Sequence, residues 1–245
     1  MGTDPLAVYK HESKSKRYID NTIRASFKQL EPSLTYFLGE LDLKNKKILD
    51  LGCAAGDMFN ALTEKFISLE YVGIDPDEKC INHAKQQYPK ATFEAIDLMK
   101  NTYTDSSFDV VMLWNWFYMA PNWKEILREA CRLSRQYVLF DNKLRLEGTT
   151  VIDIDCSFQY YHESREKNHY IVHNLYELIA FFHVDYLNLK KASVYAYPYP
   201  GKTSAFLPLP LSHTFIGSVC LERYSSEESE SVRRVGTSIE AAHNQ

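Results

Sequence analysis

The chain has 245 residues, a formal net charge of −4 and a pI near 6.1, so no overall positive field attracts nucleic acid or an anionic membrane. Its 45% hydrophobic and 24% charged residues are ordinary for a soluble globular protein, and its length suits one α/β domain. Five scattered cysteines without a C-x-x-C pair fit a reducing compartment, and no apolar run is long enough to span a bilayer, so we expect a cytoplasmic protein without membrane attachment.

The first part of the chain predicts a loose arm followed by two helices. Residues 1–13 are expected to form a flexible N-terminal arm. Apolar side chains then recur at helical spacing from Tyr18 to Leu30, and Pro32 favours the start of a second helix that continues to Leu41.

A short apolar run at 47–51 is followed by a turn of small residues that contains Gly52 and Gly56. Helical spacing resumes from Met58 to Leu69. Strand, glycine turn and helix in that order form the first half of a nucleotide-binding βαβ unit. Glycine lets the backbone approach a ligand closely, and the start of the helix offers unpaired N–H groups to an anionic group.

The ligand that this turn indicates is not a dinucleotide. A G-x-G-x-x-G motif read from Gly52 requires glycine where the chain has Ala54 and Asp57, and the Asp57 carboxylate would repel a pyrophosphate. The pattern D-x-G-x-A-x-G, formed by Asp50, Gly52, Ala54 and Gly56, resembles the first motif of class I S-adenosylmethionine-dependent methyltransferases. The resemblance implies S-adenosyl-L-methionine as cofactor and S-adenosyl-L-homocysteine as product. The cofactor's ammonium can then face Asp50, and its carboxylate the N–H groups at the helix start.

Two further apolar runs, 70–74 and 91–96, are each followed by an acid, Asp75 and Asp97. An acid after the second strand accepts hydrogen bonds from ribose hydroxyls in such folds. The alternative is that Asp75 only caps the next helix, and one carboxylate can also do both. In the methyltransferases that this chain resembles, the third acid holds the adenine amino group.

In many of these methyltransferases, helices before the first strand close over the cofactor. Tyr18 or Arg24 is therefore expected to touch the methionyl end of the cofactor, with a surface or packing role as the alternative. The predicted cofactor-binding residues are Asp50, Gly52, Cys53, Ala54, Gly56, Asp57, Met58, Asp75, Pro76, Asp97, Leu98, Trp114, Asn115, Tyr18 and Arg24.

Later runs at 108–114 and 136–141 predict a fourth and a fifth strand, and runs at 186–197 and 215–222 predict two more. Strands alternating with helices indicate a doubly wound α/β fold that binds ligands at the carboxyl ends of its strands. The resemblance implies a mostly parallel seven-stranded sheet with an antiparallel last strand and helices on both faces.

Helix starts are predicted at three places in this second part of the sequence. Residues 77–88 show helical spacing, Asn122 is followed three residues later by Glu125, and Asn174 is followed by Glu177.

The predicted organisation is an arm, one domain and a tail. The methyltransferase domain is expected at 14–224, with an irregular acceptor-side insertion at about 142–172. Residues 225–245 are rich in serine and glutamate and predict a disordered tail.

Methyl transfer from a sulfonium is an in-line displacement that needs the nucleophile within roughly 3–3.5 Å of the methyl carbon. A base is needed only where the acceptor keeps its proton near neutral pH. The candidate catalytic residues are His162, His169, His173 and Asp141, although each histidine has a surface role as its alternative. The candidate substrate-binding residues are Trp116, Tyr118 and Arg145, and no metal is expected.

The residues after the fourth strand lack the (D/N)-P-P-(Y/F/W) motif of amino-methyltransferases that act on nucleobases and glutamine amides. We therefore expect methyl transfer to an oxygen or nitrogen of a small-molecule acceptor, such as a metabolite or sugar. The alternatives are a macromolecular acceptor (tRNA or protein) and a non-catalytic S-adenosylmethionine-binding subunit. The acidic balance disfavours nucleic acid as a partner, and the sequence leaves the oligomeric state open.

Overall fold

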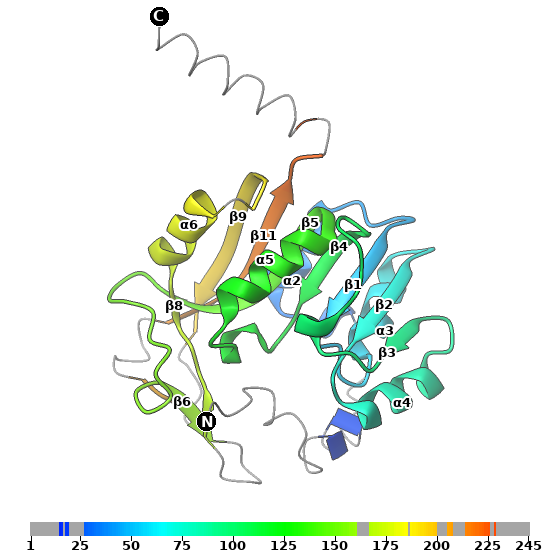
Figure 1. Ribbon diagram of the computed structural model, residues 1–245, viewed down its shortest axis with the longest axis horizontal. Coiled ribbons are helices and arrows are strands. Elements are labelled where there is room, and N and C mark those ends of the chain that lie inside the picture. Colours follow the sequence, from blue (N-terminus) through cyan, green and yellow to red (C-terminus); the bar gives the residue numbers. More distant parts are fainter. Residues whose placement is uncertain are drawn as a thin grey trace, which may run out of the picture.

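A mostly parallel sheet runs through the protein, as the computed structural model shows (Figure 1). The structure describes residues 15–16, 18–19, 27–160, 167–185, 187–199, 205–207, 214–225 and 228. The first five strands of the sheet pair in parallel, and β11 runs antiparallel to both of its neighbours. The predicted fold class is therefore confirmed. The order across the sheet is β3 (Thr92–Glu94), β2 (Glu70–Ile74), β1 (Lys47–Leu51), β4 (Phe108–Leu113), β5 (Ser134–Arg145), β11 (Phe215–Arg223) and β9 (Leu189–Pro198).

The strand order reverses between β1 and β4. The chain builds β2 and β3 on one side of β1 and then returns to place β4 on the other side. In open α/β sheets, ligands bind outside the carboxyl ends of the strands at such a reversal. All six residues of β4 are buried, as expected for a central parallel strand covered on both faces.

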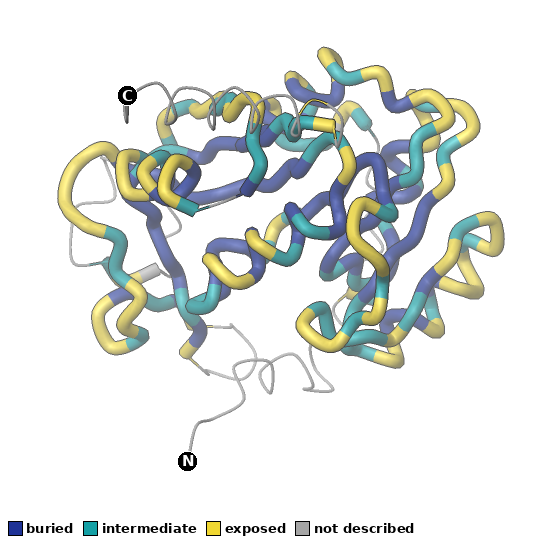
Figure 2. The backbone as a smooth tube through the Cα atoms, turned by 45° about the horizontal axis from the view of Figure 1, so that its top comes forward, coloured by how far each residue is buried: buried dark blue, intermediate teal, exposed yellow. Residues whose placement is uncertain are grey.

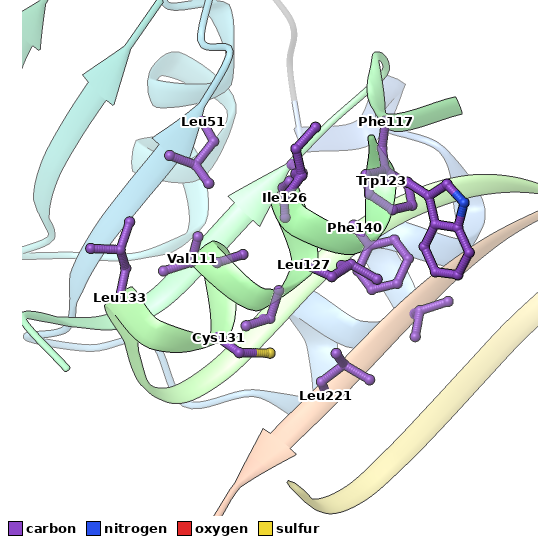
Figure 3. Packing of buried hydrophobic residues seen from close by; sticks show 14 of the residues in the cluster. Leu51, Val111, Phe117, Trp123, Ile126, Leu127, Cys131, Leu133, Phe140 and Leu221 are labelled. Carbon is purple, nitrogen blue, oxygen red and sulfur yellow. The ribbon is translucent and has the colours of Figure 1, made fainter. Parts of the chain in front are cut away.

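Helices cover both faces of the sheet, and strand alternation divides the core into two clusters. Leu51, Val111 and Phe140 point to one face, where they meet Ile126 and Leu127 of α5 (Figure 3). The opposite face packs against α2, α3 and α4. In the tube view the central strands of the sheet are dark blue and the connecting loops are mostly yellow or teal, so the core lies along these strands (Figure 2). The helices are α2 (Pro32–Glu40), α3 (Asp57–Lys65), α4 (Glu78–Gln87), α5 (Trp123–Leu133) and α6 (Leu175–Val184).

Two of the predicted helices begin after an asparagine, but only one of these asparagines makes capping hydrogen bonds with its side chain. The Asn174 side chain accepts hydrogen bonds from the N–H groups of Tyr176 and Glu177, which confirms it as the N-cap of α6. Asn122 precedes α5 at the predicted place, but its side chain makes no capping hydrogen bond. The prediction that a helix starts at Asn122 is therefore confirmed.

The segment after the fifth strand is more ordered than predicted. β5 continues to Arg145 instead of ending at Asp141, because β11 pairs with it as far as Leu144. The short strand β8 (His173–Asn174) then pairs with the end of β5. The expected irregular excursion also contains two strands, β6 (Phe158–Tyr160) and β7 (Lys167–His169). They form a second sheet with β10 (Ala205–Phe206), which lies later in the chain.

Three other predicted bounds differ from the structure. α3 ends at Lys65 and not near Leu69, and β3 is shorter than the run 91–96. In the described part of the first predicted helix, residues 27–29 form a 3-10 helix, η2 (Phe27–Gln29). The predicted arm at 1–13 and nearly all of the predicted tail lie outside the described residues.

Candidate active site

A cavity of about 510 Å³ opens at the carboxyl ends of β1, β2, β4 and β5. Its cofactor half is the part lined by residues that follow β1, β2 and β3. Its acceptor half is the part lined by Glu31, Trp116, Met119, Asp141 and Lys143. The carboxylates that line the whole cavity belong to Glu31, Asp50, Asp57, Asp75, Asp77, Asp97 and Asp141, and Lys143 is the one lysine or arginine among its described lining residues.

The glycine turn after β1 brings backbone close to the cavity. Gly52 has φ of +75°, a conformation that a side chain disfavours. A β-carbon at Gly52 would lie 2.4 Å from Nε1 of Trp116, because the indole packs directly on this turn. Trp116 Nε1 donates to the Leu51 carbonyl at 2.6 Å. The indole thus lines the cavity directly beside the glycine turn.

Asp50 is buried at the end of β1, and its carboxylate accepts a hydrogen bond from the Tyr71 hydroxyl. Burial raises the pKa of Asp50 to about 7, the Tyr71 hydrogen bond acts against this rise, and the charge of Asp75 adds to it. Without a ligand, this carboxyl therefore holds its proton up to near-neutral pH.

Asp75 joins the glycine turn to the next helix. One carboxylate oxygen accepts from the Ala54 N–H at 3.1 Å and the other from the Asp77 N–H at 2.9 Å. Burial raises the pKa of Asp75 to about 6 against these two hydrogen bonds. Asp77 is the residue that caps α4, through the N–H groups of Lys79 and Cys80. The alternative interpretation of Asp75 as the helix cap is therefore wrong, and its carboxylate lines the cavity instead.

Two more acids complete the cofactor half. Asp97 accepts from the Met99 N–H at 3.0 Å and caps the 3-10 helix η3 (Leu98–Lys100). Asp57 begins α3, and burial raises its pKa to about 6 against a hydrogen bond from Tyr88. Its Oδ1 atom is buried and has no hydrogen-bond partner among the described residues. An orphaned carboxylate oxygen at a cavity wall indicates that a donor on a ligand completes the site.

Asp141 is the central residue of the acceptor half. Its Oδ1 atom accepts from the Asn115 N–H at 2.6 Å, and its Oδ2 atom lies 3.9 Å from Lys143 Nζ. Burial raises the pKa of Asp141 to about 6. Lys143 and the Asn115 hydrogen bond oppose the rise, and Glu31 adds to it. Asn115 has φ of +63°, which asparagine tolerates better than most residues and which turns its N–H toward Asp141.

The structure places the two described candidate histidines outside the residues that line the cavity. His173 is buried, with Nδ1 3.0 Å from Asn142 Oδ1 and its ring stacked on Phe117. Burial lowers the pKa of His173 to about 3, so the ring is neutral. His169 lies half-buried on β7, and burial lowers its pKa as well. His162 lies outside the described residues.

Some of the other predicted site residues line the cavity and some do not. Tyr118 packs with Tyr170 in a separate buried cluster, and Arg145 is buried near the end of β5. Neither lines the cavity. Arg24 lies outside the described residues. Apart from Gly56, the described cofactor candidates all line the cavity: Tyr18, Asp50, Gly52, Cys53, Ala54, Asp57, Met58, Asp75, Pro76, Asp97, Leu98, Trp114 and Asn115.

Sequence reasoning missed Glu31, Met119 and Lys143. A signal for Lys143 was present, because residues two apart on a strand share a face and Lys143 follows Asp141 by two. Lys143 was missed because the predicted fifth strand ended at Asp141, two residues before it. Glu31 comes from the segment before α2, far away in the chain.

Within the described ranges, histidine, cysteine, aspartate and glutamate side chains form no group of three or more that could hold a metal ion. No helix in the described ranges combines the length and apolar character needed to cross a membrane.

Comparisons with known proteins agree with this geometry. Residues 48–136 match the family model described as the methyltransferase domain. A methyltransferase named 235L in Invertebrate iridescent virus 6 is 32% identical over 77 residues, which are 31% of this chain and 29% of the viral protein. The match therefore spans less than a third of that relative's length.

Two solved structures share the fold. A SAM-dependent methyltransferase from Methanosarcina mazei superposes with a TM-score of 0.56 at 15% identity, covering 80% of this chain and 99% of the other. Phospholethanolamine N-methyltransferase 2 of Haemonchus contortus, in complex with phosphomonomethylethanolamine and S-adenosylhomocysteine, gives 0.61 at 12% identity over 90% of this chain and 59% of the other.

The fold is that of the S-adenosylmethionine-dependent methyltransferases to which the chain is similar. Residues 48–136 are similar to the methyltransferase-domain family, and the cofactor that this similarity implies is S-adenosyl-L-methionine. The residues present fit this group. A β-carbon at Gly52 would fill the cradle, Asp57 has an orphaned oxygen, and the excess of carboxylates suits a ligand that carries a sulfonium and an ammonium.

The raised pKa values predict that cofactor affinity increases with pH. Between the ordinary pKa of 3.8 and about 7, the ligand-free folded protein binds more protons at Asp50 than the unfolded chain does, so its stability falls as pH rises through that window. A cationic ligand favours the ionised carboxylate, so it must displace the proton at low pH. We expect the Kd for S-adenosylmethionine, measured by calorimetry, to fall roughly tenfold or more from about pH 5.5 to about pH 7.5. An equal affinity at both values would contradict this assignment of Asp50.

Proposed function

We propose that the chain transfers the methyl group of S-adenosylmethionine to an oxygen or nitrogen of a small-molecule acceptor. One observation carries the proposal: a single cavity joins the cofactor half to an acceptor half that contains the buried carboxylate of Asp141. When bound, S-adenosylmethionine supplies an activated methyl group on a sulfonium, so the protein mainly has to position the acceptor.

The cofactor half has an acid for each of three polar parts of this ligand. We assign Asp50 to the ammonium, Asp75 to the ribose hydroxyls and Asp97 to the adenine amino group. Each is an acid at or just after the carboxyl end of its strand, and each lines the cavity. Tyr18 closes the cavity from the N-terminal segment.

In the acceptor half, we assign the role of proton acceptor to Asp141. It lines the cavity, whereas His169 and His173 do not. The Asn115 N–H fixes its Oδ1 atom, which leaves Oδ2 as the oxygen for an acceptor proton. Trp116 and Met119 supply an apolar wall beside it. Such a wall excludes water and suits the carbon skeleton of a small metabolite.

Two observations favour a small molecule over a macromolecule. The Haemonchus contortus neighbour is in complex with a small molecule, phosphomonomethylethanolamine. The net charge of −4 disfavours a tRNA acceptor, because nucleic acid is attracted by positive charge. A protein acceptor and a non-catalytic cofactor-binding subunit are outcomes of the test below.

The test is an acceptor screen that measures S-adenosylhomocysteine by mass spectrometry, with pools of hydroxyl- and amine-bearing metabolites, tRNA and protein. We expect product from a small-molecule pool, and a loss of turnover of roughly 100-fold or more in Asp141→Asn, in line with the removal of a general base. The matched control is Asp42→Asn, an exposed acid in the loop before β1, which should keep full turnover. Product from tRNA or protein alone, or no product while the cofactor binds, would replace this proposal with one of the alternatives.

A further inference from the structure

Lys143 is a buried lysine in the acceptor half, with 6% of its surface exposed. Its Nζ atom lies 3.9 Å from Asp141 Oδ2, 4.9 Å from the centre of the Tyr118 ring and 5.7 Å from that of Tyr199. A buried ammonium is costly unless charges or ring faces compensate for the lost water. Both kinds of partner are present here. The fold therefore holds a positive charge directly beside the proposed proton acceptor.

Asn115 and Glu31, which also lie near Asp141, have opposite effects on its pKa. Asn115, after β4, donates its N–H and favours the charged carboxylate. Glu31, before α2, adds a second negative charge near it and accepts a hydrogen bond from the Tyr197 hydroxyl of β9. Burial and Glu31 raise the pKa of Asp141, and Lys143 is the strongest opposing influence. Loss of the Lys143 charge would therefore raise the pKa of Asp141 further.

We propose that Lys143 is a positioning residue whose ammonium keeps the Asp141 carboxylate ionised, so that Asp141 can take the proton of the acceptor. This inference rests on the proposed function. In the step that it serves, the O–H or N–H bond of the acceptor breaks and the proton moves to Asp141. The electron pair of the acceptor atom forms the bond to the methyl carbon, and the carbon–sulfur bond breaks with its pair on sulfur, which becomes a neutral thioether. Asp141 then returns the proton to water.

The backbone amide of Asn115 gives a direct readout, because its N–H donates to Asp141. Its proton and nitrogen chemical shifts should follow the ionisation of that carboxylate in a pH titration by NMR. The full chain without an acceptor is sufficient for this measurement. We expect a midpoint near pH 6 in the wild-type protein.

Lys143→Met removes the charge and keeps an unbranched side chain that packs well against the rings of Tyr118 and Tyr199. We expect the Asn115 midpoint to rise by about one unit or more in this variant, as for a carboxyl that loses an adjacent cation. Lys143→Arg keeps the charge and should restore a midpoint close to that of the wild type. If Lys143→Met does not fold, Lys143→Gln provides the same comparison.

Two controls make the result specific. Lys190→Met removes an exposed lysine of β9 that pairs with Glu222 and Glu228, and it should leave the midpoint unchanged. Asp141→Asn should remove the titration from the Asn115 amide altogether. A midpoint that stays the same in Lys143→Met or Lys143→Gln would overturn the proposal.

The acid limb of the pH profile of kcat/KM gives the second readout once an acceptor is known. It should move upward in Lys143→Met by the same amount as the Asn115 midpoint, and return in Lys143→Arg. Failure of the proposed function looks different, because the Asn115 titration would still depend on Lys143 while no acceptor produced S-adenosylhomocysteine.

Discussion

Gly52→Ala is expected to abolish measurable binding of S-adenosylmethionine and to lower the thermal midpoint of the protein. The backbone at Gly52 has φ of +75°, which costs an alanine about 1–2 kcal/mol. The new β-carbon would also lie 2.4 Å from Nε1 of Trp116, whose indole is fixed by its hydrogen bond to the Leu51 carbonyl. Relief of this contact requires the indole to move into the cavity, where it would occupy the cofactor half. Calorimetry and thermal unfolding measure the two effects.

Gly39→Ala is the matched control. Gly39 lies in α2, and the nearest atom to its added β-carbon is Lys65 Nζ at 3.9 Å, an ordinary contact. Alanine is about 1 kcal/mol better than glycine inside a helix, so the thermal midpoint should stay equal or rise. Cofactor affinity should not change. Retained cofactor binding in Gly52→Ala would show that the turn does not form the cradle described here.

Asp50→Asn should weaken cofactor binding without lowering the stability of the ligand-free protein. Asparagine has the shape of the protonated carboxyl that the ligand-free site favours, and its oxygen can still accept from the Tyr71 hydroxyl. The ligand-free protein should therefore be as stable as the wild type, or more stable, at about pH 8. The affinity for the cofactor should fall by roughly 30-fold or more, because the ammonium loses a buried counter-charge. Most of the rise in affinity with pH should disappear as well.

The control for Asp50→Asn is a structural acid at the opposite end of the sheet. Asp109 lies near the start of β4, accepts from the Lys47 N–H at 2.9 Å and pairs with Arg135 at 3.0 Å. Asp109→Asn should lower stability and leave the cofactor Kd unchanged. If Asp50→Asn instead behaves like Asp109→Asn, then Asp50 is a structural residue and the assignment to the ammonium is wrong.

Local signals were enough to predict most of the glycines and acids that line one part of the cavity. Gly52 and Gly56 meet a backbone requirement that few other residues satisfy, and both have positive φ in the structure. Asp50 ends one strand, and Asp75 and Asp97 follow two others, so their places depend on short segments and on a parallel order that the alternation of strands and helices already indicates. Because parallel strands share one carboxyl end, acids at those ends come together however the rest of the chain packs.

Local sequence signals were not enough to predict which side chains line the acceptor half. His169 and His173 belong to the right region of the chain, but a histidine in a sequence does not reveal whether it faces a cavity or a core. His173 packs between Phe117 and Trp123, two residues more than 45 positions away. Its neutral form follows from that burial, which no local pattern indicates.

By itself, the sequence determined the fold class, the glycine turn and the acids of the cofactor half, because these depend on backbone conformation and on strand ends. Only the tertiary structure decided which side chains face the acceptor. The pairing of β11 with β5 extends that strand past Asp141 and places Lys143 on the same face, while the packing of α2 brings Glu31 to the cavity from more than 100 residues away. The physical reason is that a charge distribution is set by distances in space, and these distances are fixed when the layers pack.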